Sequence, residues 1–378
     1  MAYADNYLGH DIGKLGFGLM RLPGTQGGGD PDIEQMIPMV DAFMDAGFTY
    51  FDTAYVYDKG KSEEATKAAL VDRYPRESFQ LATKMNAWLG KPSEEETKRQ
   101  LEVSLERTGA GYFDYYLLHA IQKDNHEIYD NYGLWNFVQA KKEEGLVRNW
   151  GFSFHSTPDL LEQVLESHPM PDFVQLQINY ADWETPSIAA RANYEICAER
   201  GIPVVVMEPL RGGGLSTPPA NIPEILQAVQ PDMSLSSWGI RYAASLPGII
   251  TVLSGMSNME QMEDNLSYMH NFQPLNTEEQ AAIAKAQEII ANIDQIPCTD
   301  CRYCMPDCPV NMRIPAIFNA MNRRMVFNIQ GQADFAYNNA TVDVKASECL
   351  KCGNCEAACP QGIEIIDWLE KAVDMIEQ

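Results

Sequence analysis

Two cysteine runs of identical spacing lie in the last fifth of this 378-residue chain, and they constrain its fold more than any other feature. They contain eight of its nine cysteines. Each run reads C-x2-C-x2-C-x3-C-P; the first is Cys298, Cys301, Cys304, Cys308 and Pro309, and the second is Cys349, Cys352, Cys355, Cys359 and Pro360. Gaps of two residues allow one loop to surround a metal centre with thiolates, which are soft ligands, and the proline then turns the chain away. This part of the chain is therefore predicted to fold around sulfur ligation.

The doubled run resembles that of bacterial two-cluster ferredoxins, in which the fourth cysteine of each run ligates the other cluster. The resemblance implies two 4Fe–4S clusters, one on Cys298, Cys301, Cys304 and Cys359, the other on Cys349, Cys352, Cys355 and Cys308. Structural zinc sites use pairs of C-x2-C instead. Four disulfides would require an oxidising compartment, and no signal peptide is visible at the start of the sequence. The sequence therefore favours iron–sulfur clusters over zinc or disulfides.

Charge and hydropathy argue against two classes of partner. The chain carries 28 basic and 53 acidic residues, a formal net charge of −25, which argues against binding to nucleic acid. Its longest apolar runs, such as 204–207, are far too short to cross a bilayer, so no membrane partner is expected. Reduced cysteines without a visible export signal predict a cytoplasmic protein.

Between residues 14 and 270, short apolar runs alternate with helical patterns. The eight predicted strands are 15–21, 48–52, 79–84, 113–119, 147–152, 173–178, 202–207 and 248–254. The predicted helices include 32–46, 62–72, 93–108, 132–144, 158–166, 258–269 and 276–293. Eight βα units in about 250 residues are typical of a (β/α)8 TIM barrel, an α/β fold. A doubly wound sheet is the alternative, although no G-x-G-x-x-G follows the first strand.

The chain is predicted to form two domains, a barrel over residues 1–294 and a small ferredoxin-like domain over residues 295–378. The segment between Cys308 and Cys349 is too long for the hairpin of a minimal ferredoxin. Helical patterns at 315–325 and 332–338 predict that this second domain is mainly α-helical.

Polar side chains end three of the predicted strands. These are Asp52, Lys84 and His119, and Tyr57 comes five residues after Asp52. The C-terminal ends of barrel strands meet at one mouth, where enzymes of this fold have their active sites. A single strand-end histidine is more often structural, and a single aspartate is often a helix cap. The four residues in this order are much more specific for catalysis than any one of them.

This set resembles the signature of the aldo-keto reductases, through Asp52-Thr-Ala-x-x-Tyr57, Lys84, His119 and the segment 15–21, Leu-Gly-Phe-Gly-Leu-Met-Arg. The resemblance covers about residues 10–270 and looks closest to the subgroup with a C-terminal ferredoxin-like domain. It implies that Tyr57 is the general acid that protonates a carbonyl oxygen. The ammonium of Lys84 would lower the pKa of Tyr57 toward working pH, Asp52 would hold Lys84, and His119 would orient the carbonyl.

The same resemblance implies a binding site for NAD(P)H. The implied cofactor-binding residues are Gly18, Met20, Arg21, Ser153, Gln175, Met207, Leu210, Gly212, Ser254, Gly255, Met256, Asn258, Gln261 and Asn265. Ser153 and Gln175 would bind the carboxamide, the segment 208–214 would pass the pyrophosphate, and the group from Ser254 onward would hold the adenosine end. No Lys or Arg lies between Ser254 and Asn265 to meet a 2′-phosphate, which favours NADH, with Arg241 as the alternative cation.

Three functions are compatible with these two halves. The first is an oxidoreductase that reduces a small carbonyl compound with NAD(P)H, with the clusters relaying electrons or coupling to redox state. The second is a ferredoxin-linked oxidoreductase with a barrel-bound flavin, because hydride transfer moves two electrons whereas a cluster passes one. The third is a non-enzymatic redox-sensing protein, which the intact set of four polar residues disfavours. The expected partners are a carbonyl substrate and a ferredoxin or another electron-transfer protein.

Overall fold

A computed structural model describes residues 8, 12–25, 29–186, 188–219, 221–293, 295–298, 302, 304–327, 330–359 and 361–377. The predicted ligand Cys301, Pro360 and the segment 1–7 lie outside the described residues. The chain forms two compact units, which are described separately below. The first comprises Met1–Leu210 and Ser236–Glu278, and the second comprises Arg211–Leu235 and Glu279–Gln378. The domain boundary expected near residue 294 stays a prediction.

The first unit is a closed parallel barrel of eight strands in sequence order. The strands are β1 (Leu15–Gly18), β2 (Tyr50–Asp52), β3 (Gln80–Met85), β4 (Phe113–Ile121), β5 (Val147–Phe154), β6 (Phe173–Gln177), β7 (Val204–Met207) and β8 (Ile249–Ser254). β1 pairs with both β2 and β8, and this pairing closes the sheet. The TIM barrel and its eight predicted strands are therefore confirmed.

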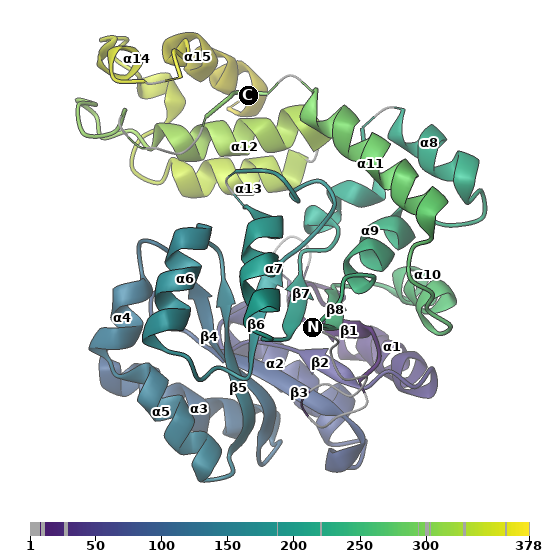
Figure 1. Cartoon of the computed structure of the whole chain (residues 1–378). Coiled ribbons are helices and arrows are strands. Elements are labelled where there is room, and N and C mark those ends of the chain that lie inside the picture. The colour runs from purple at the N-terminus through teal and green to yellow at the C-terminus, as the bar shows by residue number, and fades with distance from the viewer. Residues whose placement is uncertain are drawn as a thin grey trace. The chain divides into compact units, whose positions relative to one another are not determined.

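Helices of this unit lie outside the strands (Figure 1). They are α1 (Ile33–Asp45), α2 (Lys61–Thr66), α3 (Glu94–Thr108), α4 (His126–Asn131), α5 (Leu134–Glu143), α6 (Pro158–Ser167), α7 (Ala190–Glu199), α9 (Leu235–Ala244) and α10 (Met259–Met269). A capping box starts α3, since Ser93 and Glu96 each accept a hydrogen bond from the other's backbone N–H. The predicted helix 62–72 is α2 continued by a π-helical turn, Lys67–Val71.

Large side chains fill the inside of the barrel. The interior cluster contains Tyr50, Ala82, Tyr115, Leu117, Phe173, Val205 and Ile250. The strands β3, β4, β5 and β8 are buried along almost their whole length. Burial on both faces explains why they read as near-continuous apolar runs and not as alternating ones.

Strand β4 continues two residues past its predicted end because it bends there. Ala120 has a φ of 57°, and the register with β5 shifts between Leu118 and Ile121. The bend is held on both sides: Ser153 Oγ accepts from Ala120 N at 2.7 Å, and Asn125 Nδ2 donates to Ala120 O at 2.8 Å. An irregular residue in a strand changes the direction of the neighbouring side chain. Here that neighbour is His119, at the mouth of the barrel.

The second unit is helical, as predicted. Its helices are α8 (Ile222–Val229), α11 (Thr277–Ala291), α12 (Ile314–Phe327), α13 (Gln330–Ala340), α14 (Asn354–Ala357) and α15 (Ile365–Ile376). Its core contains Met312, Ile314, Ile317, Phe318, Met321, Ile365 and Leu369. Within the described ranges, no helix combines the length and the apolar character needed to cross a membrane.

Candidate active site and cysteine-lined cavities

Lys84, near the end of β3, is only 1% exposed and makes three polar contacts through its ammonium. Nζ donates to a carboxylate oxygen of Asp52, to the Thr53 carbonyl at 2.7 Å and to the Tyr57 hydroxyl at 3.2 Å. Asp52, at the end of β2, also accepts from Gln175 Nε2 at 3.2 Å. Burial acts to lower the pKa of Lys84, but the Asp52 carboxylate and Tyr57 raise it above its usual value. Lys84 is therefore charged, and its charge lies against the Tyr57 oxygen.

The loop after β2 reaches this position because its backbone continues to bond to β3. Thr53 N donates to Ala82 O at 2.9 Å, and Tyr55 N donates to Lys84 O at 3.2 Å. Tyr57 then begins a short 3-10 helix, η2 (Tyr57–Gly60). Three of the predicted catalytic residues, from β2, β3 and the loop after β2, are thus brought together around Lys84.

The ionisation of Tyr57 differs from the sequence-based expectation. Burial raises the pKa of the Tyr57 phenol, and the Lys84 ammonium opposes that rise without reversing it. The expected net lowering of this pKa is therefore not found, because withdrawal from water outweighs the favourable charge. The phenol keeps its proton at neutral pH, which is the form that a general acid needs.

His119 is the fourth residue of the set and lies beside Tyr57, with ring centroids 5.8 Å apart in an edge-on arrangement. Burial, followed by the charge of Lys84, holds the pKa of His119 well below its usual value, so the ring is neutral. Its Nδ1 is buried and has no hydrogen-bond partner among the described residues. This nitrogen therefore has hydrogen-bonding capacity that the described residues leave unused.

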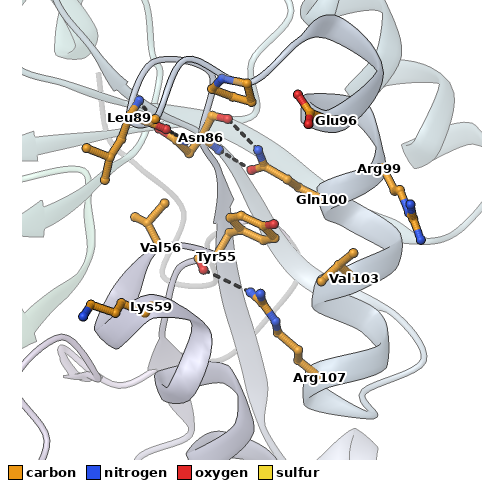
Figure 2. Close-up of a pocket in the computed structure, with 12 residues that line it drawn as sticks. Tyr55, Val56, Lys59, Asn86, Leu89, Glu96, Arg99, Gln100, Val103 and Arg107 are labelled. Carbon is orange, nitrogen blue, oxygen red and sulfur yellow. Dashed lines mark hydrogen bonds between the residues drawn. The ribbon is translucent and has the colours of Figure 1, made fainter. Parts of the chain in front are cut away.

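Two aromatic side chains that sequence reasoning missed hold the backbone of His119. Its carbonyl accepts from Trp88 Nε1 at 3.2 Å and from the Tyr129 hydroxyl. Trp88 lies in the loop after β3, and that loop is fastened to α3 by reciprocal bonds between Asn86 and Gln100 (Figure 2). The available signal was position: Trp88 follows Lys84 by four residues, in a loop at the mouth of a barrel.

Ser153 and Gln175, the residues expected to bind a carboxamide, are both 1% exposed. Each already has a partner within the protein, since the Ser153 hydroxyl accepts from Ala120 N and Gln175 donates to Asp52. The Ser153 hydroxyl proton and the Gln175 carbonyl oxygen remain available for further bonds. Their role toward a nicotinamide stays a prediction.

The residues expected at the adenosine end gather where β8 meets β1 and α10. Ser254 Oγ donates to Asn265 Oδ1 at 3.3 Å, and Asn258 caps α10 by accepting from Gln261 N at 2.9 Å. A Cβ on Gly18 would lie 3.4 Å from the Ser254 carbonyl oxygen, so these two strand ends touch. Among the other predicted cofactor-binding residues, Gly255 follows β8, Met256 is buried and Met20 is 54% exposed. Arg241, the alternative cation, is 5% exposed on α9.

An ion pair joins the loops after β1 and β7. Arg21 Nη2 lies 3.7 Å from Glu208 Oε1, and both side chains are more than a third exposed. Met207 ends β7, Glu208 has a φ of 55°, and Leu210 packs near Gly239. Arg21, a cation beside the predicted pyrophosphate segment, is thus already close to a carboxylate.

Gly212 is the one predicted cofactor-binding residue that belongs to the second unit. It has a φ of 64°, and its carbonyl accepts from Gln332 Nε2 on α13. A Cβ at this position would lie 1.9 Å from that amide nitrogen, so glycine is required for the contact. Its role toward a cofactor stays a prediction.

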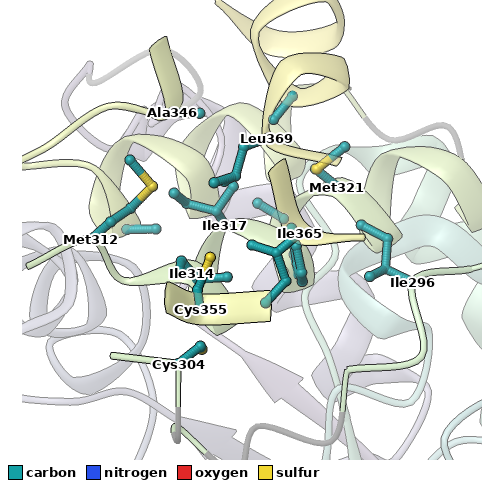
Figure 3. Close-up of a cluster of buried hydrophobic side chains, with 14 of the residues drawn as sticks. Ile296, Cys304, Met312, Ile314, Ile317, Met321, Ala346, Cys355, Ile365 and Leu369 are labelled. Atoms are coloured by element: carbon teal, nitrogen blue, oxygen red, sulfur yellow. The ribbon is translucent and has the colours of Figure 1, made fainter. Parts of the chain in front are cut away.

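Two cavities in the second unit are each lined by cysteines from both runs. One is lined by Cys308, Cys349, Cys352 and Cys355, and the other by Cys298, Cys304 and Cys359. These groups match the two predicted ligand sets apart from Cys301, which lies outside the described residues. Ile314 lines both cavities, and Figure 3 shows it beside Cys355 and Ile365. No disulfide joins the described cysteines.

Backbone amides point at two of these sulfurs. Met312 N donates to Cys308 Sγ and Lys351 N donates to Cys349 Sγ, each at 3.4 Å. N–H donors stabilise thiolate, the form that ligates metal. The other lining residues are mostly apolar, such as Val310 and Leu369. Four thiolates in an apolar cavity fit an iron–sulfur cluster, whose potential such hydrogen bonds tune.

Comparison with known proteins matches both halves of the chain. The aldo/keto reductase family profile covers residues 14–288, and that of the 4Fe-4S dicluster domain covers residues 290–360. The uncharacterized oxidoreductase YqkF of Bacillus subtilis is 25% identical over 290 residues, 68% of this chain and 87% of that protein. An aldo-keto reductase of Bombyx mori is 25% identical over 251 residues, 64% of this chain and 78% of that protein.

Solved structures agree with the barrel. The holo form of an aldo-keto reductase from Bacillus halodurans has a TM-score of 0.61 at 25% identity, covering 76% of this chain and 96% of that one. An aldo-keto reductase from Klebsiella pneumoniae, solved in complex with NADPH, has a TM-score of 0.59 at 21% identity, covering 75% and 94%. At that identity the second likeness shows the fold alone.

Proposed function

The chain belongs to the aldo/keto reductase family, and on that premise we propose that it reduces a small carbonyl compound with a nicotinamide cofactor at the barrel mouth. The observation that carries this proposal is the contact of Lys84 Nζ with both Asp52 and the Tyr57 hydroxyl. Such a contact supports proton donation, because the ammonium stabilises the phenolate that forms when Tyr57 gives up its proton.

The proposed reaction assigns one task to each residue. A nicotinamide held at the barrel mouth would supply the hydride, and with it two electrons, for the carbonyl carbon. Tyr57 donates its proton to the carbonyl oxygen, and the product is an alcohol. Lys84 stabilises the tyrosinate, and Asp52 keeps Lys84 in place. Neutral His119 donates a hydrogen bond that orients the carbonyl oxygen, consistent with its lowered pKa.

Replacing Tyr57 by phenylalanine tests this proposal. Tyr57→Phe is expected to lower kcat for carbonyl reduction by roughly 10²–10⁴-fold, the usual contribution of a general acid, while iron content is unchanged. Tyr55→Phe is the matched control, since the Tyr55 ring stacks under the Arg107 guanidinium at 4.5 Å and does not contact Lys84 through its hydroxyl. Full turnover by Tyr57→Phe, or an equal loss in Tyr55→Phe, would contradict the assignment.

NADH is the cofactor we favour over NADPH. The first turns of α10 carry Glu260, Glu263 and Asp264 and no cation, and like charges repel a 2′-phosphate. The alternative cation, Arg241, is buried on α9. The ratio of dissociation constants for the two cofactors decides this point, and tighter binding of NADPH would reverse the preference.

For the second unit, we propose that the two cavities hold two 4Fe–4S clusters with the crossed ligand sets. Eight thiols kept reduced for this purpose agree with a cytoplasmic location. The cluster held by Cys308, Cys349, Cys352 and Cys355 is the one that exchanges electrons with a carrier protein. Cys352 is exposed, and Leu350, which lines the same cavity, is 64% exposed.

A pair of exposed apolar residues tests the site of electron exchange. Leu350→Glu is expected to slow reduction of the clusters by a reduced low-potential ferredoxin, measured by stopped-flow bleaching, because it places charge on the docking surface. Reduction by dithionite should be unchanged. Val342→Glu is the control, since Val342 is 75% exposed and does not line the cavity. Equal rates in both variants would exclude docking at Leu350.

A further inference from the structure

A cavity of about 570 Å³ lies beside the barrel mouth, and none of the proposed catalytic residues lines it (Figure 2). Its walls come from the loop after β2, the loop after β3 and one face of α3. Apolar contact is offered by Val56, Leu89 and Val103. This volume falls within the roughly 300–1,000 Å³ typical of small-molecule sites.

Hydrogen bonds hold one wall of this cavity in place before any ligand binds. Asn86 N donates to Gln100 Oε1 and Gln100 Nε2 donates to Asn86 O, both at 2.8 Å. Asn86 also bonds both backbone groups of Leu89, through Oδ1 at 2.9 Å and Nδ2 at 2.8 Å. Asn86 and Gln100 are each 3% exposed, so their bonds are shielded from water. A preformed wall lowers the entropy that a ligand loses on binding.

Three cationic side chains line the cavity, and they differ in whether they already have a partner within the protein. Arg107 is held by the Tyr55 carbonyl at 3.1 Å and by Glu63 at 3.2 Å. The side chains of Arg99 and Lys59 make no hydrogen bond or ion pair with any other described residue. Unpaired cations that line one cavity are notable because acidic residues outnumber basic ones by 53 to 28 in this chain.

One acidic residue also lines the cavity, but its carboxylate is already engaged. Glu96 Oε2 accepts from Ser93 N and from the Ser93 hydroxyl, both at 2.8 Å, as part of the capping box of α3. It therefore does not pair with Arg99, three residues further along the same face of the helix. The charge that the cavity offers to a ligand is positive.

The backbone is strained where it presents Lys59. Asp58 and Lys59 have φ values of 47° and 59°, a left-handed conformation that costs a side-chain-bearing residue of order 1 kcal/mol or more. This turn lets Tyr57 face Lys84 inside the barrel while Lys59, two residues later, lines the cavity. Strain that persists in a fold is concentrated at functional segments.

We propose that this cavity is a second binding site, for an amphipathic organic anion. The apolar body of the ligand packs against Val56, Leu89 and Val103. Its carboxylate pairs with Arg99, whose planar guanidinium matches a carboxylate with two parallel hydrogen bonds. Lys59 supplies a second positive charge on the opposite side of the view in Figure 2. None of the proposed catalytic residues lines this site, although two of its walls are the loop that carries Tyr57 and the loop after β3, in which Trp88 lies.

Calorimetric titration of the full-length, cluster-loaded protein with decanoate tests this proposal, with 1-decanol as the uncharged comparison. Decanoate is expected to bind the wild type more tightly than 1-decanol does. Arg99→Gln should weaken decanoate binding by roughly tenfold, as expected for loss of a charged hydrogen-bond partner. Lys98→Gln is the matched control, because Lys98 is the preceding cation on α3, pairs with Glu94 and does not line the cavity.

Two further variants separate this site from the mouth of the barrel. Val103→Trp fills the cavity and should abolish decanoate binding, with folding checked by circular dichroism. Tyr57→Phe should leave the binding unchanged. The proposal is overturned if decanoate does not bind, if Arg99→Gln and Val103→Trp both bind it as tightly as wild type, or if NADH displaces it competitively.

Discussion

Replacing Asp52 by asparagine should strongly destabilise the barrel, because Lys84 would lose the carboxylate with which it pairs while remaining buried. Lys84 and Asp52 are 1% and 2% exposed, so water cannot substitute for the lost partner. Removing one member of a buried ion pair costs about 3–5 kcal/mol. An independent upper limit on this loss is the cost of burying Lys84 in its neutral form. Deprotonating a lysine of pKa about 10.4 at pH 7 costs about 4.6 kcal/mol, at 1.36 kcal/mol per pH unit. The two values agree.

The pH dependence of this loss gives a second check. In Asp52→Asn, the pKa of Lys84 is expected to fall below its unfolded value, because burial is no longer opposed by a carboxylate. A lysine whose folded pKa is depressed is less destabilising as pH rises toward its unfolded pKa. The difference in unfolding free energy between Asp52→Asn and wild type should therefore shrink between pH 7 and pH 10.

Urea unfolding followed by tryptophan fluorescence is the assay, in samples matched for iron content. The single variants Asp52→Asn and Lys84→Met are compared with the double variant, which leaves no buried charge. The double variant should be at least about 2 kcal/mol more stable than the sum of the two single effects predicts. Additive losses of less than about 1 kcal/mol each would falsify the reasoning, since they would mean that water or another group already solvates the pair.

Two other substitutions test separate features of the barrel. His119 has a folded pKa below its unfolded value, so stability should fall as pH drops below about 6.5, by up to about 1.4 kcal/mol per pH unit. Urea melts at pH 7 and 5.5 should show a shallower loss in His119→Gln, and an unchanged loss would argue against a buried neutral ring. Gly151→Ala should cost about 3 kcal/mol or more in the same assay, because its Cβ would lie 2.2 Å from the Phe173 carbonyl oxygen. Gly331→Ala, with nothing within 4 Å of the added Cβ, is the control that should not destabilise.

Hydrophobic runs were sufficient to locate every strand of the barrel, because each parallel strand is buried on both faces. They were not sufficient to locate the bend in β4, which depends on tertiary bonds from Ser153 and Asn125 to Ala120. No local pattern around His119 records those partners. The strand was therefore predicted to end at His119, whereas it continues to Ile121.

In the candidate site, too, some features could be predicted from the sequence and others depend on tertiary contacts. Position at strand ends was enough to place Asp52 and Lys84 together, since neighbouring parallel strands end at one edge. The direction of the Tyr57 pKa shift was not predictable from charge alone, because it is a difference between Lys84's attraction and the loss of water. Trp88 was missed because it contacts a backbone carbonyl, so that only its position in a loop at the barrel mouth indicated a role.

The distribution of cysteines between the two cavities has a consequence for how the second unit matures. Each cavity draws thiols from both runs, so neither run encloses a complete set by itself. A chain that has left the ribosome only as far as Cys308 can finish neither cavity. Removing the segment from Cys349 onward should therefore lower the iron content at both cavities, because each of them loses at least one lining cysteine. Because each cavity uses cysteines from both runs, neither cavity is complete until the second run has been synthesised.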